Sequence, residues 1–239
     1  MASWYRSNAR VRRQPSNAVM TYATADSSEP WGWGTEVINA LLSGQPQPTQ
    51  DTELLNQLGF LPGFKQLLML RQVHALEHAT VWVLSNSRQV SGQAGLPPLD
   101  NELLGGMSTE HGFYLYGQVQ LNDLKRAVQV ALRRITNGEW DLAVHPRCGT
   151  NLSVNMAVTA GLAVGFSWLF PRGPIAQLIG FGAATVLAAQ VTPDLGTLAQ
   201  RYVTTSIPFN LEIEQITRTR DPLGRSAYFV QVRWLENGV

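Results

Sequence analysis

Two uncharged stretches dominate the pattern of hydrophobic and polar positions along the chain. Residues 152–170 carry no charged side chain, nor do residues 174–191, and only Pro171-Arg172-Gly173 separates them. A helix over the first stretch spans roughly 28 Å at about 1.5 Å per residue, close to the roughly 30 Å hydrocarbon thickness of a bilayer. Neither stretch has the polar stripe of a surface helix. We therefore predict a transmembrane helical hairpin, with a buried hairpin of a soluble protein as the alternative.

Small residues inside this hairpin indicate how its helices pack. Gly161 and Gly165 form a G-x-x-x-G motif in the first helix. A second set recurs along one face of the second helix, namely Ala176, Gly180, Ala184 and Ala188. Small side chains allow membrane helices to approach closely, so both sets are predicted to support helix packing. Trp168 is expected at the membrane–water interface.

Helical patterns also flank the hairpin. Apolar residues at mixed spacings of three and four predict a helix of about five turns that begins near Phe64, with a loop over residues 85–98. A second amphipathic helix is predicted from an Asn122 cap to Asn137-Gly138. Asp51 and Thr52 are predicted to cap a short helix that ends at Leu58.

Strand patterns occur on both sides of the hairpin. Residues 113–116 favour a strand that continues past Gly117 to Leu121. Residues 209–217 and 228–234 alternate apolar with polar side chains around a turn at residues 221–224, and this pattern predicts a β-hairpin. We expect the three strands to join in one small sheet. The predicted fold class is an α+β membrane protein, a transmembrane helical hairpin with a split cytoplasmic-side α+β domain.

Four regions follow from these elements. Residues 1–60 form a flexible N-terminal arm and linker, in which Trp31-Gly32-Trp33-Gly34 is a local hydrophobic anchor or a membrane-interface anchor, and residues 35–42 favour a short helix. Residues 61–151 hold the helical metal-motif region with a short β segment. Residues 152–191 are the hairpin. Residues 192–239 leave the membrane at 192–196, form a short helix over 198–203, and pack their β-hairpin on residues 61–151.

Charge and cysteine content narrow the classes of protein. A net charge of +1 and a pI near 7.9 argue against a nucleic-acid-binding surface. The single cysteine excludes an internal disulfide framework and fits a reducing compartment or a thiol ligand. No apolar segment follows the N-terminal arginines, so an ordinary secretory signal is not expected.

The distribution of basic residues predicts the orientation of the hairpin. Lys and Arg residues are frequent on both flanks, whereas the turn contains only Arg172. The positive-inside rule then places both termini on the cytoplasmic or stromal side of a bacterial inner membrane or a thylakoid membrane.

The candidate chemistry begins at His74-Ala75-Leu76-Glu77-His78. On a helix, positions i and i+4 lie on one face about 6 Å apart, so the two imidazoles can share one metal ion. The spacing H-x-x-E-H is also that of the inverted zinc peptidases, in which the glutamate moves a proton of the attacking water. The alternative is that both histidines are hydrogen-bonded core residues without a metal.

A second segment, His145-Pro146-Arg147-Cys148, supplies the third and fourth candidates. The predicted metal ligands are therefore His74, His78, His145 and Cys148, with zinc as the expected ion and iron as an alternative. Glu77 is predicted to be catalytic. Two other roles of Glu77 remain open, those of a direct metal ligand and of a partner that orients a histidine. Four bound ligands would close a structural site, whereas a free position would permit catalysis.

Other residues near these motifs are weaker candidates for a role in the site. His111 is expected on a surface loop, with a proton-shuttle or ligand role as the alternative. Arg147 is expected to mark the membrane interface, or else to bind an anionic substrate or lipid headgroup. Asp194 is a distant further ligand candidate. A competing mechanism uses Cys148 as a nucleophile with His145 as its base.

Three motifs in order resemble those of a known family. These are the H-x-x-E-H at residues 74–78, the His-Pro-Arg-Cys-Gly-Thr at residues 145–150, and, after two apolar helices, Leu198 followed by Val203-Thr204-Thr205. The run resembles the YqhQ-like family of predicted metal-dependent membrane proteins, and a related group of cyanobacterial and plastid membrane proteins of unknown function. The resemblance implies site roles for His74, Glu77, His78, His145 and Cys148. This chain departs from it at Asn151, where the family has serine, and has only two membrane helices.

The leading hypothesis is an integral membrane protein with a His/Glu/Cys metal site near the bilayer surface, acting as a metal-dependent hydrolase or peptidase. The alternative is a non-enzymatic assembly or accessory subunit of a membrane complex, such as a photosynthetic one, with a structural metal site. The expected partners are the lipid bilayer and a membrane protein complex, and no nucleic acid.

Overall fold

The computed structural model describes residues 46–89, 103–171 and 173–236. The described residues all belong to one compact unit. The expectations for the N-terminal tail, for residues 31–34 and for a helix over residues 35–42 lie outside the described residues.

The described part of the chain places its helices between and before two pairs of strands. The elements are α2 (Gln50–Leu58), α3 (Phe64–Gln89), β1 (Gly105–Thr109), β2 (Gly112–Tyr116), α4 (Leu121–Thr136), the 3₁₀ turn η1 (Trp140–Ala143), α5 (Gly149–Leu169), α6 (Pro174–Ala199), the π turn η2 (Gln200–Thr204), β3 (Leu211–Arg220) and β4 (Ser226–Trp234).

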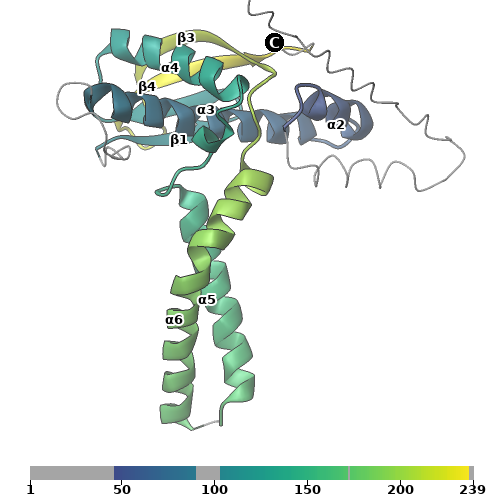
Figure 1. Ribbon diagram of the computed structural model, residues 1–239, viewed down its shortest axis with the longest axis vertical. Helices are drawn as coiled ribbons and strands as arrows, with labels where there is room; N and C mark the ends of the chain where they lie inside the picture. Colours follow the sequence, from purple (N-terminus) through teal and green to yellow (C-terminus); the bar gives the residue numbers. More distant parts are fainter. Residues whose placement is uncertain (1–45, 90–102, 172, 237–239) are drawn as a thin grey trace, which may run out of the picture. The chain divides into compact units, whose positions relative to one another are not determined.

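One antiparallel sheet unites the strands from both sides of the helical hairpin. Its order is β1-β2-β4-β3, so that β2 pairs with β4 and the C-terminal β-hairpin completes the sheet, as the alternating pattern predicted. Figure 1 shows α3 and α4 beside this sheet. Phe113 and Leu115 of β2 and Val230 of β4 are almost fully buried, and they belong to one core with Val128 of α4. The α+β class is therefore confirmed.

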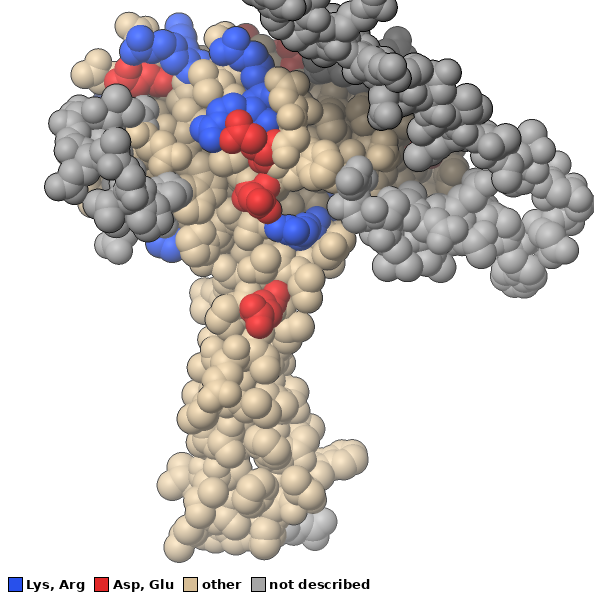
Figure 2. Space-filling view, viewed as in Figure 1, with Lys and Arg blue, Asp and Glu red and all other residues tan. Residues whose placement is uncertain are grey.

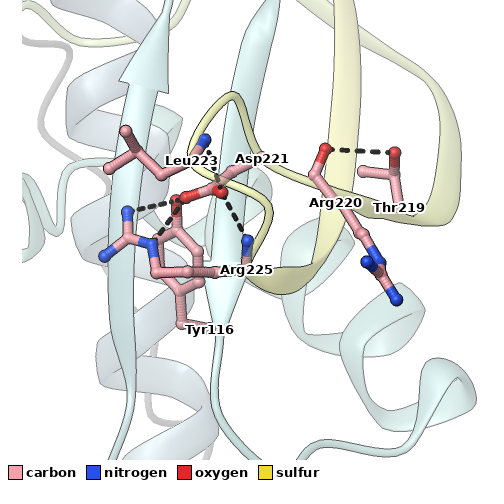
Figure 3. Close-up of polar contacts among 6 residues, drawn as sticks. All are labelled: Tyr116, Thr219, Arg220, Asp221, Leu223 and Arg225. Atoms are coloured by element: carbon pink, nitrogen blue, oxygen red, sulfur yellow. Dashed lines mark hydrogen bonds and ion pairs between the residues drawn. The ribbon is translucent and has the colours of Figure 1, made fainter.

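The turn between β3 and β4 is held by the carboxylate of Asp221. Its Oδ1 accepts hydrogen bonds from the backbone N–H groups of Leu223 (3.0 Å) and Arg225 (2.8 Å). Its Oδ2 accepts from the Tyr116 hydroxyl of β2 (2.8 Å) and from Arg225 Nε (2.7 Å), as Figure 3 shows. The predicted turn at residues 221–224 is confirmed, and Tyr116 fastens it to the neighbouring strand.

Three predictions about element boundaries were wrong. The strand does not continue past Gly117, because this glycine has φ +113° and a β-carbon there would meet the Leu103 carbonyl. Helix α4 consequently begins at Leu121, after an extended Gln120, and Asn122 lies inside it. Helix α3 is 26 residues long, about seven turns, and includes Ser85–Gln89 of the predicted loop. The rest of that loop lies outside the described residues.

The start of α2 also differs from the prediction. The helix begins at Gln50, one residue before the expected cap. Asp51 is buried instead of capping the helix, because its Oδ2 accepts hydrogen bonds from Gln72 Nε2 (2.6 Å) and Ser206 Oγ (2.7 Å). These bonds attach α2 to α3 and to the chain that follows η2.

Helices α5 and α6 run side by side (Figure 1), and both are long and apolar enough to cross a membrane. Most of their surface carries no charged side chain (Figure 2). Of the small residues predicted on one face of α6, Gly180, Ala184 and Ala188 are buried, whereas Ala176 is only partly buried. The prediction that Gly161 and Gly165 of α5 support close packing of the helices was wrong. A β-carbon added to either glycine would meet no atom of the described residues within 4 Å.

We predicted the second helix of the hairpin over residues 174–191, but α6 continues through Pro193 to Ala199. A proline inside a helix removes a backbone hydrogen bond, and it costs about 3 kcal/mol in an isolated helix. Packing against α5 offsets this cost on both sides of the proline. Thr192 Oγ1 donates to Asn155 Oδ1 (3.2 Å), and Gly196 lies against Asn151 so closely that a β-carbon would overlap its amide oxygen.

Candidate metal centre

Helix α3 presents His74, Glu77 and His78 from one region of its surface, because these positions differ by three and four residues. The two imidazole rings are 4.3 Å apart between centroids and meet edge to face. His78 and Glu77 are buried, and His74 is partly buried. The H-x-x-E-H motif therefore lies on a helix, as predicted, with its side chains turned toward the protein.

Backbone carbonyl groups fix the orientation of both rings. Nδ1 of His74 is 3.0 Å from the Thr204 carbonyl oxygen, and Nδ1 of His78 is 2.6 Å from that of Ala143. A carbonyl oxygen only accepts, so each Nδ1 donates its hydrogen, and in the neutral ring Nε2 keeps a free lone pair. Metal-binding histidines are oriented in the same way in known sites.

Cys148 brings a sulfur atom to the same place. It is the residue before α5, and its Sγ lies 3.2 Å from Nε2 of His74 and accepts from the backbone N–H of Thr150 (3.4 Å). Burial raises the pKa of the thiol, but a hydrogen bond and charge from His78 and hydrogen bonds from Thr150 lower it more, so that the pKa lies below its ordinary value. A lowered pKa favours the thiolate, which is the metal-binding form.

The ligand atoms of His74, His78 and Cys148 all lie within 4.8 Å of one another. Donor atoms around a tetrahedral zinc ion are roughly 3.5 Å apart, since each lies about 2.0–2.3 Å from the metal. The three residues could therefore hold a metal ion.

His145 lies beside this cluster but is not one of its three converging residues. Its ring centroid is 5.6 Å from that of His78 and 4.9 Å from that of Trp82. Its Nδ1 accepts a hydrogen bond from the backbone N–H of Arg147 (3.3 Å). The structure thus brings together three of the four predicted ligands and places the fourth at their edge.

Glu77 lies next to the cluster in a covered position. Its Oε2 accepts a hydrogen bond of 2.5 Å from Ser108 Oγ of β1, and Gly106 lies against its other oxygen. Burial raises the pKa of this carboxyl, although Ser108 and the charge of His74 act in the opposite direction. A raised pKa makes the carboxylate a stronger base, which is the direction in which general bases of enzymes are tuned.

A cavity of about 570 Å³ opens onto all of these groups. Ligand-binding pockets commonly have volumes of about 300–1,000 Å³, so a small molecule or part of a larger one fits. The cavity is lined by Leu67, Leu70, Arg71, His74, Glu77, His78, Leu104, Gly105, Gly106, Met107, Ser108, His145, Arg147, Cys148, Gly149, Thr150, Val203 and Thr204.

A chain of amide groups links the segment of His145 to the hairpin. The His145 backbone N–H donates to Gln200 Oε1 (2.8 Å), and Gln200 Nε2 donates to Asn151 Oδ1 (2.8 Å). Asn151 Nδ2 in turn donates to the Pro146 carbonyl (2.7 Å). Gln200 is completely buried, so these bonds replace its contacts with water. Asn151, where this chain departs from the resembled family pattern, therefore positions the segment of His145.

Sequence reasoning missed Gln200, Ser108 and Gly106. The available signal was the Gly105-Gly106 pair, because a glycine in a strand often marks the close approach of another group. Of the weaker candidates, Arg147 lines the cavity. His111 lies on the turn between β1 and β2 with 75% of its side chain exposed, which confirms the loop prediction. Neither His111 nor Asp194 is among the residues that line the cavity.

Comparisons with known proteins cover this whole region. A family profile described as "Domain of unknown function (DUF6391)" matches residues 69–216, which include every residue of the cluster. An uncharacterized protein of Picosynechococcus sp. strain PCC 7002 is 49% identical over 189 residues, 79% of this chain and 91% of that protein. No solved structure gives a significant match. The predicted resemblance to uncharacterised cyanobacterial proteins is confirmed, whereas these matches show no YqhQ-like or metal-dependent family.

Proposed function

The chain belongs to the DUF6391 family, and we propose that it is an integral membrane protein with a zinc-dependent hydrolase site near the bilayer surface. One observation carries the proposal. Two imidazoles with carbonyl-anchored Nδ1 atoms converge with a thiol whose pKa is lowered, next to a buried glutamate and a cavity. Hydrogen-bonded core histidines alone do not require this convergence.

His74, His78 and Cys148 would hold the ion, and iron is the alternative metal. Three protein ligands are typical of catalytic zinc sites, whereas structural sites usually have four. The ion would supply a Lewis acid that polarises a substrate carbonyl or a water molecule. The resemblance of the three motifs to the YqhQ-like family also supports a metal at this position.

Glu77 is proposed as the general base and acid. It is held by Ser108 on one side and faces the same cavity as the three ligands. In this position it can take a proton from an attacking water and return it to the leaving group. Exchange for glutamine would remove the proton acceptor but preserve most of the side-chain shape.

The membrane location is proposed from the exposed apolar surface of the hairpin. Leu152, Met156 and Val164 of α5 are more than half exposed in the protein alone, which is costly in water and favourable in lipid. The basic flanks favour a location of both termini on the cytoplasmic or stromal side. A green fluorescent protein fused to the C-terminus should fluoresce in cells, because this reporter folds in the cytoplasm.

The decisive experiment is elemental analysis of the purified full-length protein. We expect about one zinc per chain, lost in His74→Ala and in Cys148→Ser. His111→Ala is the matched control, because this histidine is exposed and does not line the cavity. A wild-type protein without bound metal, or a His74→Ala variant that keeps it, would refute the proposal.

A structural metal site in an accessory subunit of a membrane complex is the second candidate. The position of the His145 ring beside His78 favours it, because a small shift could add a fourth ligand and close the site. In that case His145→Ala should release the metal. Glu77→Gln should also leave every measured function unchanged, whereas a hydrolase would keep its metal and lose activity.

A further inference from the structure

The wall of the cavity is divided between apolar and cationic side chains. Leu67 and Leu70 of α3 are 51% and 37% exposed although they line the cavity, and Val203 of η2 is 65% exposed. Such residues leave apolar surface uncovered next to a polar centre. An acyl chain is a chemical group that this surface fits.

The cavity lies where the helical hairpin joins the α+β domain. Gly149 and Thr150 belong to the first turn of α5, Val203 and Thr204 follow α6, and all four line the cavity. If the hairpin crosses the bilayer as proposed, these residues mark the level at which the chain enters and leaves the lipid. A molecule held in the membrane can therefore reach the cavity without passing through water.

Positive charge lines the same cavity. Arg147 contributes a guanidinium group, which donates to the Leu104 carbonyl (3.3 Å), and Arg71 contributes another, which donates to the carbonyls of Tyr202 (3.2 Å) and Thr205 (3.0 Å). Among the described residues that line the cavity, Glu77 is the one carboxylic acid.

We propose that the ligand of this cavity is an anionic acyl lipid that enters from the bilayer, a statement that rests on the proposed membrane hydrolase. The phosphate of its headgroup pairs with Arg147, and the acyl chain lies along Leu67, Leu70 and Val203. For an ester-linked lipid, water adds to the acyl carbon and the ester C–O bond breaks. Glu77 receives the proton of the water and returns it to the alcohol, so that a fatty acid and a lysolipid are released.

Site-specific photocrosslinking tests this proposal. The full-length protein is placed in nanodiscs of equal amounts of phosphatidylglycerol and phosphatidylcholine, with benzoylphenylalanine at Met107, which lines the cavity. Glu214 on β3 is exposed and serves as the control position. We expect a lipid adduct at position 107, absent at 214, in which phosphatidylglycerol exceeds phosphatidylcholine by about tenfold, because both lipids carry the phosphate but the arginines of the cavity repel the choline cation.

Matched variants separate charge recognition from general damage. Arg147→Gln should equalise the two lipid adducts, whereas Arg126→Gln, which removes an exposed arginine of α4, should leave their ratio unchanged. Excess glycerol phosphate, the headgroup without a chain, should not compete. Equal adducts in the wild type, no adduct at position 107, or full competition by glycerol phosphate would overturn the proposal.

The metal content of the same samples separates this inference from the proposed function. An anionic-lipid adduct on a protein without metal supports lipid binding and refutes the hydrolase. One zinc per chain without a lipid adduct refutes the lipid ligand and leaves the metal site standing.

Discussion

Gly106 of β1 lies against the carboxylate of Glu77 on α3, so closely that a β-carbon at position 106 would overlap Oε1. Gly106→Ala should therefore displace Glu77 from its hydrogen bond with Ser108 and lower the free energy of unfolding by about 1–3 kcal/mol. Thermal unfolding of the detergent-purified protein measures the change. Gly105→Ala is the matched control, because a β-carbon there meets no atom of the described residues within 4 Å. Equal effects of the two substitutions would contradict the close approach.

The amide chain that links His145 to the hairpin predicts a cost for removing Gln200. Gln200→Leu leaves the buried His145 N–H and the Asn151 oxygen without this partner, which should destabilise the protein by about 1–3 kcal/mol. The exposed Gln215, which donates to Gln231 Oε1 (2.7 Å) on the sheet, provides the control. Gln215→Leu should change the melting temperature little. If Gln200→Leu is as mild as this control, the network does not support the site.

Removal of a bound metal should lower stability in proportion to its affinity. An ion at about 100 times its dissociation constant stabilises the folded state by about 2.7 kcal/mol. A chelator should accordingly lower the melting temperature of the wild type and of His111→Ala. His74→Ala should melt at the same temperature with and without chelator. A wild-type protein that does not respond to the chelator would argue against a bound ion.

The turn between β3 and β4 predicts a specific dependence on pH. Burial alone would raise the pKa of Asp221, but hydrogen bonds from Tyr116 and Arg225 and the charge of Arg225 lower it to about 2. A lowered pKa means that the carboxylate stabilises the folded state above its unfolded pKa of about 3.9, and that this contribution disappears as the pH falls through about 2. Figure 3 shows the contacts concerned.

Asp221→Asn tests this dependence. The melting temperature of the wild type should exceed that of the variant at pH 6, and the difference should shrink as the pH falls below about 4. Differences between the two proteins cancel the titration of all other carboxyl groups. A difference that stays constant down to pH 2.5 would show that Asp221 contributes no charge-dependent stability.

The packing of the hairpin predicts that substitutions of two neighbouring alanines differ in their effect on stability. Ala188 is fully buried between α5 and α6, whereas Ala189 is exposed. Ala188→Leu should separate the helices and cost about 1–3 kcal/mol, and Ala189→Leu should be tolerated. Thermal unfolding in detergent or nanodiscs compares the two. The reverse order of melting temperatures would place the helix interface on another face of α6.

Several features could be derived from the chain itself because their causes are local. The spacing of His74, Glu77 and His78 determines that they share a region of a helix, whatever packs against it. Residues 152–170 and 174–191 lack charges, and this property alone makes two apolar helices that can cross a membrane. The alternation over residues 209–217 and 228–234, with a turn between them, predicted the β3–β4 hairpin for the same reason.

The tertiary structure decided which partners meet these elements. Cys148, and not His145, converges with the two histidines, because the position of the segment before α5 depends on the contacts of η1 and η2 with α3 and of η2 with α5. Likewise, α6 continues through Pro193 because contacts with α5 offset the tendency of a proline to interrupt a helix.

Gly161 and Gly165 show that a sequence motif does not determine which face of a helix is packed. The G-x-x-x-G motif makes a close approach possible, but no neighbour lies against these two glycines among the described residues. Periodicity determines how a side chain is oriented on its own element. The element that faces it is determined by the packing of the whole chain, and the candidate site is made of such contacts between distant segments.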